Sequence, residues 1–177
     1  MHQPTEKKKE SWSDAFRHTA QRLTLSACDG NAASVLTAIQ NDALVHAPYY
    51  AKPQQDGGEE WQQQQGDWQT AARFNLAVCE RSSRQVIGCV RFTPVSVSYF
   101  LHPAYWGRGL GSEMVLAACS YMPQLLDLPI LRATVLRENV ASRRILEQAG
   151  FAFAGMGTQV HRGVATVAVL NYQRPGC

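Results

Sequence analysis

A strand-like run, a glycine turn and an apolar helix follow one another between Tyr99 and Tyr121, and this order limits the folds open to the chain. The strand closes at His102-Pro103, and three glycines follow at alternate positions: Gly107, Gly109 and Gly111. Glycine lets backbone N–H groups converge where a side chain would obstruct, and the start of a helix attracts anions. The sequence therefore predicts a phosphate-binding turn that leads into a buried helix from Ser112 to Tyr121.

The spacing of these glycines matches neither of two common nucleotide motifs. A P-loop requires GxxxxGK followed by Ser or Thr, and a dinucleotide fold requires GxGxxG. The run Gly107-Arg108-Gly109-Leu110-Gly111 has neither pattern. The glycines alone leave two interpretations open: a phosphate site, in which Arg108 adds a charge contact, or a tight turn with no ligand.

The remaining pattern predicts one domain that mixes strands and helices. Residues 31–40 and a segment capped by Asn139 read as helices, and 51–69 reads as a loop with a short helix that shapes a substrate entrance. Alternating or continuous apolar runs predict strands at 22–27, 74–80, 85–92, 96–101, 130–136, 151–155 and 164–170.

Length and composition fit a single globular domain. The chain has 177 residues, 45% of them hydrophobic and 18% charged, which suffices for one core. We expect a flexible arm over 1–18 and the domain over 19–174. The longest apolar stretches, 114–119 and 164–170, are shorter than the roughly 18 residues of a membrane span. The N-terminus has lysines without an apolar signal core, so we expect a cytoplasmic protein with no membrane partner.

Cysteine and charge patterns exclude further classes. The five cysteines are scattered without a CxxC pair, which predicts reduced thiols and no metal site. The net charge of +3 is too small to predict nucleic acid as a partner. Hydrolysis through a cysteine and a histidine lacks a recognisable nucleophile turn.

Two motifs carry a resemblance to a known family. The run from Tyr99 to Glu113 resembles the acetyl-CoA signature of the GNAT N-acetyltransferase superfamily. Trp106 stands where that superfamily often has Gln or Arg, and Trp there is typical of the RimJ/RimL-like branch. The run from Glu138 to Phe151 is similar to the second signature of that branch, and Gln21 to Leu25 matches its first strand. The similarity spans about 20 to 172.

The resemblance implies an α/β (α+β) GNAT fold, a mixed and strongly twisted central sheet of about seven strands flanked by about four helices. Strands ending at Leu101 and near Arg137 would diverge, and the pantetheine arm of acetyl-CoA, the co-substrate, would enter between them. The resemblance assigns cofactor binding to Tyr99, Phe100, Leu101, Trp106, Gly107, Arg108, Gly109, Leu110, Gly111, Ser112, Asn139, Ser142 and Arg143.

The same resemblance assigns catalysis to Ser142 and Asn139. Many family members place a tyrosine at the position of Leu146 to protonate the leaving thiolate, and Ser142 is the substitute that this branch suggests. The alternative is that Ser142 is an ordinary helix-start residue. A backbone N–H of Phe100 or Leu101 would stabilise the oxyanion. A glutamate that serves as general base in the branch is replaced by Ser96. The remaining candidates for the base are His46, Glu80 and His102, each of which is more often a surface or structural residue; His102 could equally be a turn residue.

The predicted activity is direct transfer of acetyl from acetyl-CoA to a primary amine. The acceptor is a protein N-terminus, an amino acid or a small amine metabolite, and the enzyme is a monomer or homodimer. The alternative is an acyl-CoA-binding regulatory module with weak catalysis, which the missing tyrosine and glutamate keep open.

Overall fold

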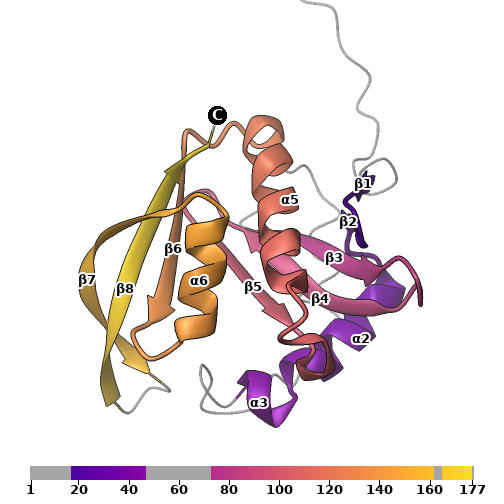
Figure 1. Cartoon of the computed structure of the whole chain (residues 1–177), viewed down its shortest axis with the longest axis horizontal. Coiled ribbons are helices and arrows are strands. Elements are labelled where there is room, and N and C mark those ends of the chain that lie inside the picture. The colour runs from indigo at the N-terminus through magenta and orange to yellow at the C-terminus, as the bar shows by residue number, and fades with distance from the viewer. Residues whose placement is uncertain (1–16, 47–72, 162–164, 177) are drawn as a thin grey trace, which may run out of the picture.

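The computed structural model describes residues 17–46, 73–161 and 165–176 (Figure 1). The predicted strands and helices follow one another in the expected order, and β1 and α3 are additional to them. The elements are β1 Arg17–Thr19, β2 Leu23–Ala27, α2 Gly30–Gln40, α3 Ala43–His46, β3 Phe74–Glu80, β4 Val86–Phe92, β5 Val97–Leu101, the 3-10 turn η1 Pro103–Tyr105, α5 Leu110–Leu125, β6 Ile130–Leu136, α6 Val140–Gln148, β7 Ala152–His161 and β8 Ala165–Pro175. Over the described ranges, no helix has both the length and the apolar character that crossing a membrane requires.

The first sheet is an antiparallel run of five strands in the order β1-β2-β3-β4-β5. Its middle strands are buried on both faces. Successive side chains of a strand point to opposite sides, so neighbouring residues belong to different core clusters. Leu76 and Val78 join the main core with α5, whereas Ala77 lies against residues of α2. The helices α5 and α2 therefore cover opposite faces of this sheet.

The second sheet contains three antiparallel strands in the order β6-β8-β7. In β6 the burial alternates: Leu131, Ala133 and Val135 are buried, whereas Arg132 and Thr134 are exposed. This period-two pattern shows that only one face of β6 contributes to the core, the core that Leu146 of α6 also joins.

The two sheets meet where β5 lies beside β6. These strands belong to different sheets, and in Figure 1 their arrows run in the same general direction, with α5 and α6 side by side in front of them. The fold prediction is confirmed, with β5 and β6 as neighbours that share no ladder. Every ladder between described strands is antiparallel. The parallel part of the predicted mixed sheet is therefore the neighbouring pair β5 and β6.

Several predicted boundaries differ from the observed ones. The structure has β1 at Arg17–Thr19, paired with β2, so its first strand begins inside the range expected for the arm; residues 1–16 lie outside the described part. Helix α5 begins at Leu110 and continues through Pro123 to Leu125, so the helix boundaries expected at Ser112 and Tyr121 are wrong. The loop expected over 51–69 lies outside the described residues.

Candidate active site

The glycine turn leaves the start of α5 without a side-chain cap. Gly107 and Gly109 have φ angles of +73° and +75°, a left-handed conformation that favours glycine. Gly109 is the N-cap residue and makes no side-chain capping bond. The other two long helices are capped differently, since Asp29 accepts from Ala32 and Asn139 accepts from Ser142. The first backbone N–H groups of α5 are therefore available to an anion.

Gly111 is set apart from the other two glycines by its packing. It is buried, and a Cβ added to it would lie 2.8 Å from Cδ1 of Ile145 in α6. Its neighbour Ser112 donates a hydrogen bond from Oγ to Oε1 of Gln148, also in α6. The absence of a side chain at Gly111 thus allows α5 and α6 to pack closely. A Cβ at this position would meet α6 and not a bound phosphate, so the contribution of Gly111 to a ligand is limited to its backbone.

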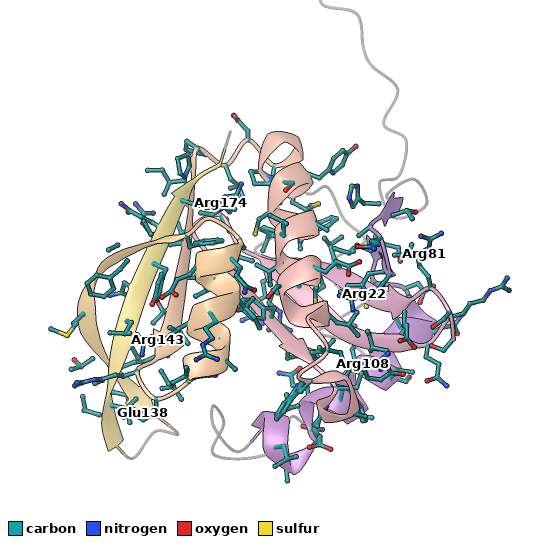
Figure 2. All side chains as sticks on the ribbon, in the orientation of Figure 1. Arg22, Arg81, Arg108, Glu138, Arg143 and Arg174 are labelled. Carbon is teal, nitrogen blue, oxygen red and sulfur yellow. The ribbon has the colours of Figure 1, made fainter. Side chains whose placement is uncertain are left out.

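Arg22 and Glu113 fix the glycine turn against the first sheet. Glu113, in the first turn of α5, accepts hydrogen bonds from the backbone N of Arg22 (2.6 Å) and from its Nε (2.8 Å). Nη1 of Arg22 also donates to the backbone carbonyl of Arg108 (2.8 Å). Figure 2 labels Arg22 and Arg108 on the side of the molecule where α5 begins. The turn is therefore pre-ordered by β2.

Arg108 and Glu80, two of the predicted candidates, bind each other. Nη2 of Arg108 lies 2.8 Å from Oε1 of Glu80, and its guanidinium lies over the ring of Tyr105. A hydrogen bond from Ser83, and then the contact with Arg108, lower the pKa of Glu80 below its ordinary value. A carboxylate with a lowered pKa is a weaker base, so this geometry does not support Glu80 as the general base.

Trp106 holds the end of β5. Its Nε1 donates a hydrogen bond of 2.7 Å to the backbone carbonyl of Leu101, and the residue is 48% exposed. The indole occupies the backbone acceptor that a ligand along β5 would otherwise meet at this point. The indole thus has a structural role, and its place beside the co-substrate stays a prediction.

Hydrogen bonds at the two ends of β5 show which backbone groups face β6. The N–H of Thr93 donates to the carbonyl of Ser96 and the N–H of His102 donates to Ile87, so the even-numbered residues of β5 face β4. In agreement, a Cβ added to Gly88 of β4 would lie 2.5 Å from the carbonyl oxygen of Phe100. The peptide groups of Tyr99 and Leu101 point the other way. The structure therefore does not place the backbone of Phe100 on the ligand-facing edge.

Ser142 is fixed by contacts from two elements. Its backbone N donates to Oδ1 of Asn139 (3.0 Å), which caps α6. Its Oγ lies 2.8 Å from the hydroxyl of Tyr99 in β5, and that hydroxyl also donates to the Ser142 carbonyl (3.1 Å). The structure thus brings together the predicted site residues Tyr99, Asn139 and Ser142. The side-chain contact between Tyr99 and Ser142 was not expected from the sequence.

A cavity of about 350 Å³ lies between β5 and β6, and Tyr99 and Ser142 are part of its wall. Leu146 also lines it, so the position expected to hold a tyrosine in many relatives is apolar here. Of the described residues that line the cavity, Arg91 is the one with a formal charge. Its Nε donates to Oδ1 of Asn75 (2.9 Å). Within the described lining, neither a carboxylate nor an imidazole reaches the cavity.

The other predicted site residues have structural contacts or are not described. Nδ1 of His102 accepts a hydrogen bond from Ala104 (3.1 Å) and caps η1, so the turn interpretation of this histidine holds. His46 ends α3, and its side chain lies outside the described part. Arg143 extends from the first turn of α6 and is half-buried (Figure 2).

The three buried cysteines of the described residues are poor nucleophiles. Burial raises the pKa of Cys28 to about 12 and that of Cys119 to about 12, and it raises the pKa of Cys89 as well. A thiol reacts as its thiolate, so these groups stay protonated and inert. Among the described residues, there is also no cluster of three His, Cys, Asp or Glu side chains that would hold a metal ion.

Comparison with known families identifies this arrangement. Residues 22–152 match the model of the acetyltransferase (GNAT) domain. The chain belongs to this family. The superfamily expectation is thereby confirmed. A curated relative, the uncharacterized N-acetyltransferase YoaA of Bacillus subtilis, is 29% identical over 83 residues, which are 43% of this chain and 47% of YoaA. The chain thus spans about half the length of that relative.

Solved GNAT structures share the fold. An acetyltransferase of the GNAT family from Bacillus anthracis superposes with a TM-score of 0.77 at 18% identity, covering 91% of this chain and 99% of that one. The ribosomal α-N-protein acetyltransferase RimL in complex with coenzyme A gives 0.76 at 16%, covering 88% and 95%. Spermidine N-acetyltransferase from Vibrio cholerae in complex with coenzyme A and spermine gives 0.72 at 16%, covering 88% and 96%. RimL-type proteins are thus among the structural neighbours.

Proposed function

We propose that this GNAT domain transfers an acetyl group directly from acetyl-CoA to a primary amine bound in the cavity between β5 and β6. The observation that carries the proposal is the path from the uncapped start of α5, along the edge of β5 that faces β6, to Ser142. The pyrophosphate of acetyl-CoA would lie at the start of α5, its pantetheine arm along β5 and its thioester near Ser142. The neighbours that contain coenzyme A support this choice of co-substrate.

The residues at hand fit a pyrophosphate at the start of α5. Backbone N–H groups of Leu110, Gly111 and Ser112 supply donors at the positive end of a helix. Arg108 and Arg143 supply positive charge from the turn and from α6, the neighbouring helix. The peptide group of Tyr99 and the N–H of Leu101 would pair with the arm, since the Leu101 carbonyl already accepts from Trp106, and one of the two N–H groups would stabilise the oxyanion.

The chemistry of the cavity favours an α-amino group as the acceptor. An alkyl amine with a pKa of about 10 is neutral in about one molecule in a thousand at pH 7, whereas an α-amino group with a pKa of about 8 is neutral in about one in ten. No described side chain of the lining is a strong base, so the proton would leave through water. The positive charge of Arg91 also disfavours a polyamine. We therefore propose a protein N-terminus or an amino acid as the acceptor.

We place the reaction in the cytoplasm, where the buried thiols of Cys28, Cys89 and Cys119 stay reduced. The rival function is an acyl-CoA-binding module without turnover, and the cavity lining without a described carboxylate or imidazole favours it. A panel of amines with mass-spectrometric readout separates the two. We expect acetylation of N-terminal peptides or amino acids at higher kcat/KM than of spermidine. Binding of acetyl-CoA without any acetylated product would support the rival.

A matched pair of glycine variants tests the phosphate site. Gly109 and Gly150 both have left-handed φ angles (+75° and +83°), but Gly150 lies at the end of α6. Gly109→Ala and Gly150→Ala should each lose about 1 kcal/mol of stability. Only Gly109→Ala should also weaken acetyl-CoA binding by calorimetry. Equal affinity in the two folded variants would contradict a phosphate site at the turn.

A further inference from the structure

We propose that Tyr99 supplies, through Ser142, the proton that the departing thiolate of coenzyme A takes up. The inference rests on the proposed acetyl transfer and deepens it. Tyr99 was expected to contribute its backbone alone, as part of the strand edge. The structure places its hydroxyl 2.8 Å from Oγ of Ser142, and both residues line the same cavity.

The position of Ser142 is set from both sides of the cavity. On the α6 side, Asn139 accepts the backbone N–H of Ser142 and holds it in the first helical turn. On the β5 side, the Tyr99 hydroxyl contacts both Oγ and the carbonyl oxygen of Ser142. The single proton of the Tyr99 hydroxyl goes either to the carbonyl oxygen or to Oγ of Ser142. When it goes to Oγ, the hydroxyl hydrogen of Ser142 is directed elsewhere. The serine is then oriented to donate to a third group in the cavity.

Acidity explains why a serine needs this partner. A thiol has a pKa of about 8.5 and a phenol about 10, whereas an aliphatic hydroxyl is a far weaker acid than either. Proton transfer from Ser142 alone would leave an alkoxide in a half-buried wall, which is costly. With Tyr99 behind it, the charge ends on a phenol whose acidity is close to that of the thiol. Leu146, further along α6 in the same wall, has no proton to give.

The step balances in atoms and charge. The acceptor nitrogen forms a bond to the acetyl carbon, and the acetyl–sulfur bond breaks with its electron pair on sulfur. Sulfur takes the proton of Ser142 Oγ, and Oγ takes the proton of Tyr99. The phenolate then takes, through cavity water, the proton that the acceptor nitrogen loses. One proton thus moves from the amine to the thiol, and Tyr99 links the two ends of the transfer.

Charges around Tyr99 are compatible with a transient phenolate. Arg91 of β4, the charged residue of the described cavity lining, is paired with Ser98 and so points to the opposite face of the sheet from Tyr99; its positive charge acts on a phenolate only from a distance. On α6, the hydroxyl of Tyr99 contacts the neutral Ser142, which Asn139 caps. Ser98 of β5 and Thr134 of β6, which also line the cavity, add hydroxyl groups without charge.

Tyr99→Phe tests the proposal, because it keeps the ring and removes the hydroxyl. With the best amine of the panel at pH 7, Tyr99→Phe and Ser142→Ala should each lower kcat by about 10²-fold. The double variant should be no slower than either single one, because the two groups act as a unit. Acetyl-CoA affinity should stay within about twofold. The control is Tyr121→Phe, which removes a phenol hydroxyl from the far part of α5, where Tyr121 stacks on His18; its kcat should equal that of the wild type.

The pH profile separates proton supply from packing. A thiolate needs no proton above its own pKa, so the deficit of Tyr99→Phe should shrink as the pH rises past about 8.5. A deficit that is constant with pH, a double variant whose loss is the product of the single ones, or a kcat equal to the wild type would overturn the inference. If the wild-type protein acetylates no amine, the proposed function fails and the inference with it. If the wild type is active and only Tyr99→Phe behaves unexpectedly, the proposed function stands.

Discussion

The indole of Trp106 donates a 2.7 Å hydrogen bond to the backbone carbonyl of Leu101, five residues earlier. The bond closes the end of β5 over the 3-10 turn η1 and sets the direction in which the chain enters the glycine turn. The geometry of the glycine turn therefore depends on the side chain of the residue just before it.

Trp106→Phe should cost stability through this bond. The phenyl ring keeps part of the packing but has no N–H, so we expect a loss of about 0.5–1.5 kcal/mol in the free energy of unfolding, the usual net value of a hydrogen bond. Urea denaturation measures it. An unchanged midpoint and slope would show that water replaces the indole without cost.

Gly111→Ala should disturb the packing of α5 against α6. The new Cβ would lie 2.8 Å from Cδ1 of Ile145, and overpacking of this kind costs about 1–3 kcal/mol. Ile145→Val removes that methyl group, so the double variant should recover part of the loss. Thermal unfolding of the four proteins provides the double-mutant cycle. If the effects of the two substitutions on stability simply add, the Cβ of Gly111→Ala does not clash with Ile145.

Glu80→Gln should show a pH-dependent stability difference. The pKa of Glu80 is lowered in the folded chain, chiefly by the hydrogen bond from Ser83, from an ordinary value of 4.5. The charged form therefore stabilises the fold above pH 4.5, and this stabilisation is lost as the pH falls through the lower, folded-state pKa. The melting temperature of the variant should lie below that of the wild type at pH 7, and the gap should close in acid. The exposed Glu138 supplies the control Glu138→Gln, for which we expect no such gap.

Thiol reagents should leave the activity intact. Cys28, Cys89 and Cys119 are buried and hold raised pKa values, so iodoacetamide at pH 8 should modify them only on unfolding. Peptide mapping by mass spectrometry, with and without denaturant, checks this. Rapid native alkylation of Cys89, which lines the cavity, together with loss of turnover would reopen a role for a thiol.

Arg91→Gln should alter the choice of acceptor. Without the positive charge in the cavity wall, the ratio of kcat/KM for spermidine to that for an N-terminal peptide should rise about tenfold, the effect of a moderately screened charge. The melting temperature shows whether loss of the bond to Asn75 has unfolded the variant. A constant ratio in a folded variant would mean that Arg91 does not sense the acceptor.

The sequence predicted the elements and the backbone chemistry because these depend on local order. Asn139 as a helix cap and the glycine turn before α5 follow from spacing within a few residues, and both are observed. The contacts that give individual side chains their roles join distant positions. Tyr99 and Ser142 are 43 residues apart, and Arg108 and Glu80 are 28 apart. No periodicity links such pairs, so the side-chain role of Tyr99 and the packing role of Gly111 became visible only in the folded chain.

The place of β6 beside β5 also bears on what can pair with the edge of β5. A strand edge normally invites a strand from another molecule and so promotes aggregation. The outer edge of β5 lies beside β6 instead, and the contact between Tyr99 and Ser142 joins β5 to α6 there. A second protein chain would need to displace that contact, whereas a slender extended ligand need not. The edge of β5 is therefore open to a narrow extended ligand but closed to a strand of another protein chain.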